Sequence, residues 1–231
     1  MIKILRKLKR RTKRIGLKYT KPQEKVESIS IGTEYGSFTI CPEKLNKDSF
    51  IYSFGIGEDI SFDIGLIELF GCWVYAFGPT PKSIGWLKKQ TLPEEFQWFE
   101  YGLANCDGNL QFDEPSNPNW VSYTATRKDT DRLKIWLPVR KLSTIMNTFG
   151  HTHIDILKMD IEGCEYDVIE DILRSDINIG QILVEFHHRF SEYGKQATYR
   201  IIKLLIERGY LLFSISDNGE ETSFISQSEI I

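Results

Sequence analysis

The sequence has few of the features that mark specialised classes of protein. No apolar run approaches the roughly 18 residues that a membrane-spanning helix needs. The first 25 residues contain no apolar segment of the secretory-signal type. Cysteine is sparse: Cys41, Cys72, Cys106 and Cys164 are widely spaced and form no CxxC pair. This pattern argues against a zinc site or a disulfide framework and favours reduced thiols in a cytoplasmic protein.

The net charge of −3 hides a strong asymmetry along the chain. Residues 1–25 hold eleven of the 29 basic residues and one of the 32 acidic residues. We therefore divide the chain into a basic N-terminal arm, residues 1–26, and one domain, residues 27–231. Residues 1–21 could contact an anionic membrane, a partner or nucleic acid, or could be a solvated basic segment without a specific role. The acidic domain itself is a poor candidate for specific nucleic-acid binding, and the sequence does not indicate an oligomeric state.

Apolar strands alternate with amphipathic helices through most of the domain. Strands are predicted at 50–57, 72–81, 96–104, 154–160 and 180–188, and helices at 58–71, 82–90, 139–150, 164–175 and 195–210. Short strands are also expected within 27–40, a hairpin or loop at 106–120, and a terminal hairpin at 210–227 around Asn218-Gly219. This alternation predicts an α/β, Rossmann-like, mostly parallel sheet with an antiparallel C-terminal hairpin. Such sheets bind ligands at the carboxyl ends of their strands.

A glycine turn follows the first long strand. Gly55-Ile56-Gly57 lets the backbone approach a nucleotide closely, but it is a weak signal alone. A dinucleotide fingerprint needs a third glycine where this chain has Ile60. Glu58 and Asp59 would repel a pyrophosphate but tolerate a cationic ligand such as S-adenosylmethionine. The pattern therefore favours a methyl donor over NAD, although both acids could serve only to complement a helix dipole.

Acidic residues and a histidine gather where two strands are expected to end. Asp160 is the first candidate for a catalytic base, and Glu162 is the second, with capping of the turn as its alternative role. His187 could act as a base near neutral pH and is preferred to His188. Glu165, at the start of the next helix, is expected to be a helix-dipole partner.

A metal-binding role for these residues also stays open. Asp160, Glu162 and His187 could together hold a hard metal ion. His151 and His153 lie before their strand, at the opposite edge of the sheet, and are expected to be structural.

Four segments together resemble the FkbM-type family of S-adenosylmethionine-dependent methyltransferases. They are IYSFGIGEDISFD (51–63), WVYAFGPTP (73–81), GLANCDGNLQF (102–112) and IDILKMDIEGCEYDVI (154–169), in order and with suitable spacing. The resemblance extends from about residue 30 to about residue 228. It implies a class I methyltransferase fold, with a seven-stranded sheet whose last strand is antiparallel. It also implies O-methylation of hydroxyl groups on sugars, polysaccharides or secondary metabolites.

The resemblance also assigns positions around the cofactor. The methionine part would be bordered by Gly55, Ile56, Gly57, Glu58 and Asp59, and the ribose by Phe77, Gly78 and Thr80. The adenine would be bordered by Ala104, Asn105, Cys106 and Asp107, while Asp160 and Glu162 would face the methyl group and the acceptor.

Gly78 departs from the family pattern. Class I methyltransferases usually carry an acid there, which binds both ribose hydroxyls. Loss of these bonds could cost about 2–3 kcal/mol. Either Thr80 or Glu58 compensates, or cofactor binding is weakened, or the chain is a non-catalytic binding protein with this fold.

The sequence thus predicts a cytoplasmic O-methyltransferase that uses S-adenosylmethionine. Its expected acceptor is a saccharide, a glycoconjugate precursor or a secondary metabolite. The basic arm would make a peripheral contact at the inner face of a membrane. A nucleotide-sugar or NAD-linked enzyme is the less favoured catalytic alternative.

Overall fold

The computed structural model describes residues 22, 26–117, 120–126, 131–190 and 192–229. The predicted membrane contact through residues 1–21 therefore lies outside the described residues. Among the helices that are described, none combines the length and apolar character needed to cross a membrane.

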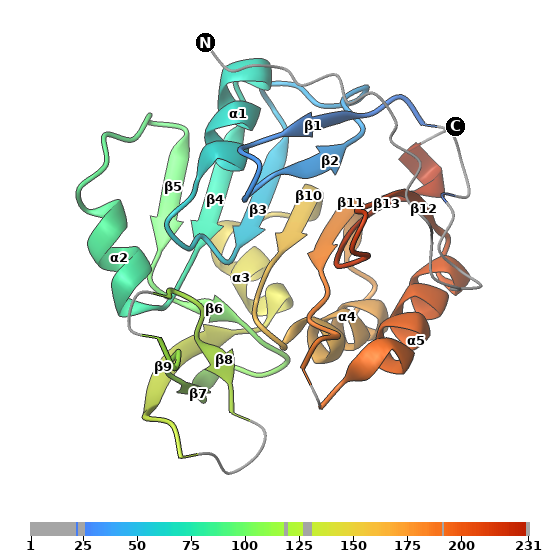
Figure 1. Cartoon of the computed structure of the whole chain (residues 1–231). Helices are drawn as coiled ribbons and strands as arrows, with labels where there is room; N and C mark the ends of the chain where they lie inside the picture. The colour runs from blue at the N-terminus through green and yellow to red at the C-terminus, as the bar shows by residue number, and fades with distance from the viewer. Residues whose placement is uncertain (1–21, 23–25, 118–119, 127–130, 191, 230–231) are drawn as a thin grey trace.

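A seven-stranded sheet forms the centre of the domain (Figure 1). From one edge to the other its strands are β12 (Tyr210–Ile215), β13 (Glu221–Ser226), β11 (Asn178–Glu185), β10 (His153–Met159), β3 (Phe50–Phe54), β4 (Trp73–Phe77) and β5 (Phe96–Phe99). The pairs from β11 to β5 are all parallel, whereas β13 runs antiparallel to both of its neighbours. The predicted mostly parallel sheet and its antiparallel terminal hairpin are confirmed.

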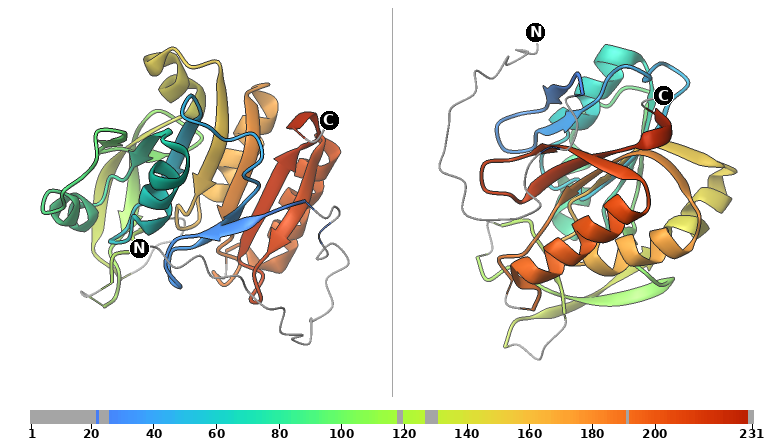
Figure 2. Two further views of the ribbon diagram at one scale, coloured as in Figure 1. Left: turned by 90° about the horizontal axis from the view of Figure 1, so that it is seen from above. Right: turned by 90° about the vertical axis from the view of Figure 1, so that its right-hand side faces the viewer.

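Helices cover both faces of this sheet because its central strands are apolar on both sides. On one face lie α1 (Ser61–Phe70), α2 (Pro81–Leu87) and the small hairpin of β1 (Ile29–Ile31) and β2 (Phe38–Ile40), around one buried cluster. On the other lie α3 (Leu142–Phe149), α4 (Glu165–Arg174) and α5 (Gly194–Glu207), around a second cluster. The right-hand view of Figure 2 shows α5 and the β1–β2 hairpin on opposite sides of the sheet.

A second sheet of four strands was not predicted. Its order is β6 (Gly102–Leu103), β9 (Lys134–Arg140), β7 (Gly108–Asp113) and β8 (Thr124–Ala125). The predicted strand 96–104 is therefore wrong as one element, because it divides between β5 and β6 in different sheets. The predicted hairpin or loop at 106–120 contains β7, which pairs with the distant β9. Figure 1 shows this small sheet beyond the carboxyl ends of β3 and β4.

Three predicted element boundaries differ from those of the structure. The helix expected at 58–71 begins only at Ser61, so Glu58 and Asp59 lie in the turn before it. The helix expected at 139–150 begins at Leu142, because the residues before it complete β9. The strand expected at 180–188 ends at Glu185 and leaves His187 in the turn that follows.

Candidate functional site

A cavity of about 380 Å³ lies at the carboxyl ends of the central strands. This volume is in the range of small-molecule sites. Its lining includes residues 54–59 after β3, 77–80 after β4, and 160–162 after β10. The small sheet contributes another part of the wall through Gly102, Leu103 and Phe112. The β1–β2 loop, residues 32–37, adds Tyr35, which is 84% exposed.

Gly55 brings two of these loops into direct contact. Its φ angle is +86°, and a Cβ atom there would lie 1.7 Å from the carbonyl oxygen of Asp160. The Gly55 N–H donates to Phe77 O at 3.2 Å, and the Asp160 N–H donates to Phe54 O at 3.1 Å. Only glycine fits this position, since any side chain would separate β3 from β10. The predicted glycine turn thus places Asp160 beside the cofactor-type loop.

Glu58 and Asp59 have different surroundings within the same turn. Glu58 is exposed and lines the cavity. Asp59 accepts hydrogen bonds from the Thr33 hydroxyl and from the Ser61 N–H, the latter at 2.8 Å. Burial opposes the charge on Asp59, but these hydrogen bonds outweigh it and lower its pKa. Asp59 therefore ties the β1–β2 loop to the start of α1.

Gly78 lies on the cavity wall, directly after the buried Phe77. A Cβ at Gly78 would meet the Ile56 Cδ1 atom at 3.3 Å, so Ile56 fills the space next to the missing side chain. Thr80 is the N-cap of α2 and is hydrogen-bonded to Ser83. The other group expected to compensate for the missing acid, Glu58, is exposed and lines the same cavity.

The four residues assigned to the adenine do not line the cavity. Ala104 is buried, and Asn105 and Cys106 are exposed. Asp107 accepts hydrogen bonds from the Lys141 N–H and the Thr144 hydroxyl, both at 2.9 Å, and so holds the start of α3. Residues 104–107 follow β6 and lie outside this lining, so their assignment to the adenine stays a prediction. The preceding Gly102 and Leu103 occupy the wall instead.

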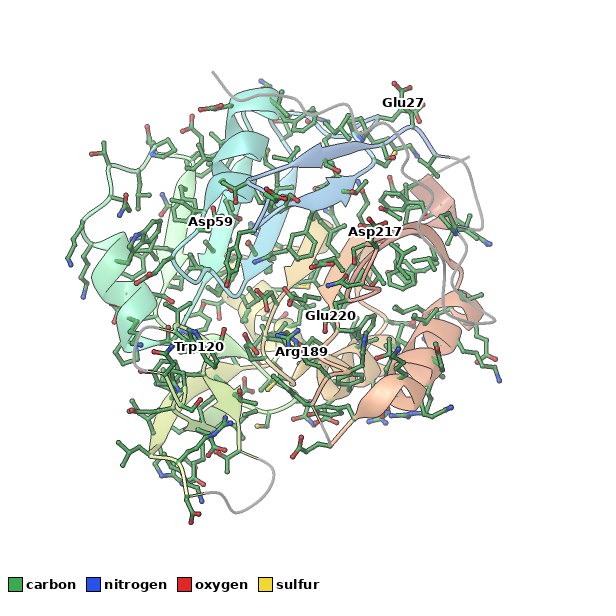
Figure 3. All side chains as sticks on the ribbon, in the orientation of Figure 1. Glu27, Asp59, Trp120, Arg189, Asp217 and Glu220 are labelled. Atoms are coloured by element: carbon green, nitrogen blue, oxygen red, sulfur yellow. The ribbon has the colours of Figure 1, made fainter. Side chains whose placement is uncertain are left out.

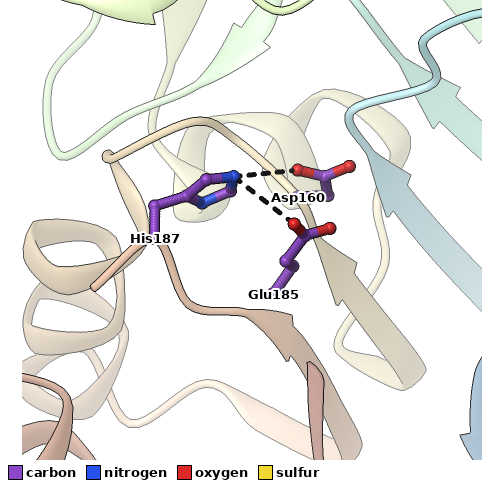
Figure 4. A group of neighbouring side chains, drawn as sticks. All are labelled: Asp160, Glu185 and His187. Atoms are coloured by element: carbon purple, nitrogen blue, oxygen red, sulfur yellow. Dashed lines mark ion pairs between the residues drawn. The ribbon is translucent and has the colours of Figure 1, made fainter. Parts of the chain in front are cut away.

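The three predicted catalytic side chains do come together. His187 is fully buried, and its Nε2 atom lies 3.1 Å from Glu162 Oε2 and 3.6 Å from Asp160 Oδ1. Glu185 also approaches, with Oε1 at 3.7 Å from the same nitrogen. Figure 4 shows Asp160 and Glu185 facing the ring of His187. Sequence analysis missed Glu185, although its position at the end of a strand next to His187 was a usable signal.

Glu165 holds this cluster in place and is more than a helix-dipole partner. Its side chain is fully buried and accepts from Ile161 N–H at 3.2 Å and Gly163 N–H at 2.9 Å. Its Oε1 atom also lies 2.6 Å from His187 Nδ1. Between the two bonded amides, Glu162 has a φ angle of +49°. Such a conformation costs about 1–3 kcal/mol outside glycine, so the Glu165 bonds maintain a turn that aims Glu162 at His187.

Arg189 balances part of the negative charge. Its guanidinium lies 3.4 Å from Glu185 Oε1 and 3.1 Å from Glu220 Oε1. Figure 3 shows Arg189 and Glu220 next to each other. Lys158 is a second cation near the cavity, and its ammonium donates to Gly55 O at 2.8 Å. Neither cation was singled out from the sequence.

Burial and mutual proximity shift the pKa values in the cluster. Burial raises the pKa of Asp160 to about 6, and the nearby Glu162 adds to the rise. Burial also raises the pKa of Glu185 to about 7, with a contribution from Asp160. For His187, burial favours the neutral ring, but Glu165 and Glu162 raise the pKa to about 11. Perturbed groups of this kind concentrate at functional sites.

The other histidines lie elsewhere. His151 Nδ1 is 2.8 Å from the Tyr52 hydroxyl, and its ring stacks on Phe50. His153 lies 3.6 Å from Asp155. Both are at the end of the sheet away from the cavity, in the kind of packing expected of structural histidines. His188 does not line the cavity.

The fold and site define a doubly wound α/β protein with an acidic small-molecule cavity at the carboxyl edge of its sheet. Residues 56–212 match the methyltransferase FkbM domain family, and the chain belongs to that family. It is similar to a probable methyltransferase-like protein 24 from Homo sapiens, with 29% identity over 202 residues, covering 82% of this chain and 49% of the relative. The Rattus norvegicus protein of the same description is 28% identical over 187 residues, covering 76% and 45%.

The chain thus spans about half the length of the curated relatives it matches. No solved structure matches it significantly.

Proposed function

We propose that the chain is an S-adenosylmethionine-dependent O-methyltransferase with a class I methyltransferase fold. Membership of the FkbM family supports methyl transfer. The strand order, with β13 inserted antiparallel between β11 and β12, supports the fold assignment. The observation that carries the proposal is the contact between Gly55 and the Asp160 carbonyl. It joins the cofactor-type glycine loop to the carboxylate cluster in one cavity.

The charges around the cavity favour this cofactor over a dinucleotide. Eight lining residues are acids and two are basic. The acids are Glu34, Glu58, Asp59, Asp63, Asp160, Glu162, Glu185 and Glu221. An acidic cavity opposes a pyrophosphate but suits the sulfonium and ammonium groups of S-adenosylmethionine. Glu58, which is exposed and lines the same cavity as Gly78, is the residue we assign to the ribose hydroxyls in place of the usual acid.

The reaction needs an aligned hydroxyl and a destination for its proton. The acceptor oxygen attacks the methyl carbon, the carbon–sulfur bond breaks, and its electron pair stays on sulfur, giving S-adenosylhomocysteine. Asp160 and Glu162 border the position next to the glycine loop, so they can orient the hydroxyl and accept its proton. His187 is held by Glu165 through Nδ1, and its Nε2 atom contacts both carboxylates and so positions them.

A saccharide, a glycoconjugate precursor or a hydroxylated secondary metabolite is the acceptor class we propose. Carboxylates such as Asp160 and Glu162 accept hydrogen bonds from adjacent hydroxyls. Tyr35, exposed on the cavity wall, offers an aromatic face to the apolar side of a sugar ring. A cytoplasmic location with a peripheral membrane contact through residues 1–21 is part of the same proposal. Deletion of residues 1–21 should then reduce flotation with anionic liposomes.

Calorimetric titration with S-adenosylmethionine and S-adenosylhomocysteine tests the cofactor. Binding of both in the micromolar range supports the proposal. Failure of both to bind, to the native chain and to Gly78→Asp alike, would overturn it. Incubation with radiolabelled S-adenosylmethionine and a panel of saccharides then tests transfer to oxygen.

A non-catalytic binding protein is the second candidate, and Gly78 is the observation that favours it. Gly78 lacks the acid that the family usually carries there, and Ile56 crowds the position, since its Cδ1 atom lies 3.3 Å from where a Cβ would stand. This candidate predicts that the native chain binds neither cofactor while Gly78→Asp binds both. Cofactor binding by the native chain would reject it.

A further inference from the structure

Three side chains direct ligand atoms at one region next to the cavity, and Glu162 adjoins them through His187. Nε2 of His187 lies 3.1 Å from Glu162 Oε2, 3.6 Å from Asp160 Oδ1 and 3.7 Å from Glu185 Oε1. Two ligands that are each about 2.1 Å from one ion are about 3–4.2 Å apart in octahedral geometry. The ligand atoms of Asp160, Glu185 and His187 all lie within 4.8 Å of one another. These separations fit a shared divalent cation.

Two of the converging atoms make no hydrogen bond. His187 Nε2 and Asp160 Oδ1 are buried, and neither makes a hydrogen bond within the part of the chain that the structure describes. The His187 ring is fully buried, so water does not reach this nitrogen from its own side. Buried polar atoms are nearly always satisfied, and an orphaned pair aimed at one point indicates an absent ligand.

Glu165 determines which ring nitrogen of His187 faces the three carboxylates. Its carboxylate lies 2.6 Å from Nδ1, so the Nδ1–H of the ring donates to it. Without an ion, a second proton on Nε2 offsets the three facing carboxylates; a divalent cation would take the place of that proton and accept the Nε2 lone pair. Histidines that bind metals usually donate their other N–H to a carboxylate in this way.

The local charge also calls for a cation. Asp160, Glu162, Glu185 and Glu165 surround His187 within 3.7 Å of its ring nitrogens. Arg189 is shared among Glu162, Glu185 and Glu220, and its side chain is 44% exposed. One guanidinium and one imidazolium do not neutralise four carboxylates, whereas a divalent ion in place of the Nε2 proton lowers the remaining negative charge.

We propose that Asp160, Glu162, Glu185 and His187 bind one divalent cation, with Glu165 as the partner that orients His187. Three carboxylates favour a hard ion, and one imidazole adds affinity for first-row transition metals. Mn²⁺ is therefore the best match, and Mg²⁺ is the second choice. Glu185 and Asp160 line the cavity, so the open positions of the ion face the acceptor.

The role of the ion rests on the proposed methyl transfer. A cation beside the glycine loop holds the acceptor hydroxyl and makes its proton more acidic. Asp160 and Glu162 then act through the ion, and a pair of neighbouring hydroxyls could bind it together. The site therefore favours acceptors with adjacent hydroxyl groups, such as sugars.

Binding of Mn²⁺ alone to the full chain tests the site without any methyl donor. The protein is treated with EDTA, dialysed and titrated with MnCl₂, and bound ion is measured by calorimetry and by loss of the free Mn²⁺ electron paramagnetic resonance signal. We expect one ion per chain with a micromolar dissociation constant. Glu185→Gln should weaken binding at least about tenfold.

Glu220→Gln is the matched control. Glu220 and Glu185 both contact Arg189, at 3.1 and 3.4 Å, but Glu220 lies outside the group of ligand atoms. Its replacement should leave Mn²⁺ affinity unchanged. If Glu185→Gln proves unfolded by circular dichroism, Asp160→Asn serves in its place. No Mn²⁺ binding by the native chain, or equal binding by the native chain and the folded ligand variant, would overturn the proposal.

Titration of S-adenosylhomocysteine into the same samples separates this inference from the proposed function. If the homocysteine analogue binds and Mn²⁺ does not, the metal site is wrong and the methyltransferase proposal stands. If Mn²⁺ binds and the analogue does not, the metal site stands and the cofactor proposal falls.

Discussion

The Oε1 atom of Glu165 lies 2.6 Å from Nδ1 of His187, and both side chains are fully buried. The same carboxylate accepts hydrogen bonds from the amides on either side of Glu162. One residue therefore fixes the ring of the histidine and the turn that carries a facing acid. This relationship connects α4 to the turn after β11 and gives the cluster a defined geometry.

Glu165→Gln should therefore destabilise the fold although it preserves the side-chain volume. Its new amide group cannot accept from one of its present donors, and an unsatisfied buried group costs about 1–3 kcal/mol. Urea unfolding at neutral pH measures the loss. Glu170→Gln, a carboxyl on the same helix paired with Arg174 and Arg200, should change stability by less than about 0.5 kcal/mol. Equal effects of the two substitutions would contradict the role assigned to Glu165.

Alanine at two neighbouring glycines should have unequal consequences. Gly55→Ala places a methyl group 1.7 Å from the Asp160 carbonyl oxygen, whereas Gly57→Ala meets Val121 Cγ2 at 3.8 Å. Both positions have positive φ, so each substitution carries a backbone strain of about 1–2 kcal/mol. Gly55→Ala adds the clash and should cost more than about 4 kcal/mol or prevent folding. Thermal unfolding of both variants checks this, and similar melting temperatures would show that β3 and β10 are not in contact there.

The hydrogen bonds of Asp59 predict a pH-dependent stability. Thr33 and Ser61 lower its pKa in the folded state relative to the unfolded value of about 3.9. A lowered carboxyl pKa stabilises the fold above the unfolded pKa, and this contribution disappears as the pH falls through the folded pKa. Asp59→Asn should therefore lose about 1 kcal/mol at neutral pH, with the difference shrinking below about pH 4.

Urea unfolding across this pH range measures the effect. Asp48→Asn, at an exposed turn position, is the control and should change stability little at any pH. A loss for Asp59→Asn that stays constant with pH would contradict a preference of these bonds for the ionised carboxylate.

An aspartate at position 78 should strengthen cofactor binding. Gly78→Asp should raise S-adenosylmethionine affinity by up to about 30-fold, the equivalent of about 2 kcal/mol for two new ribose hydrogen bonds, and by less to the extent that Glu58 already binds the ribose hydroxyls. The Ile56 Cδ1 atom, 3.3 Å from the new Cβ, limits this gain. Adding Ile56→Val removes that atom and should raise affinity further.

Calorimetry on both variants tests this expectation. Gly85→Asp provides the same chemical change where nothing lies within 4 Å of the new Cβ, and it should not alter binding. A lower affinity of Gly78→Asp than of the native chain would show that Gly78 is required for the site.

The site was only partly predictable because its members are far apart in the chain. Asp160 and Glu162 stood out as acids directly after an apolar strand, and His187 stood out at the end of another. Glu165 looked like an ordinary first-turn acid, since nothing local reveals that His187, 22 residues later, lies against it. A pattern of short strands does not show that the chain changes sheets at Gly102, so the sequence did not reveal that Ala104, Asn105, Cys106 and Asp107 lie outside the cavity lining.

The sequence by itself determined the alternation of strands and helices, the terminal hairpin and the glycine at the β3–β10 contact. Those features depend on local periodicity, turn chemistry and the steric freedom of Gly55. Only the tertiary structure decided which polar groups meet. Parallel pairing brings the ends of β10 and β11 together, and burial then forces Asp160, Glu162, Glu185 and His187 to satisfy one another or a shared ligand. That requirement arises from low solvation in three dimensions, which no single segment of the chain encodes.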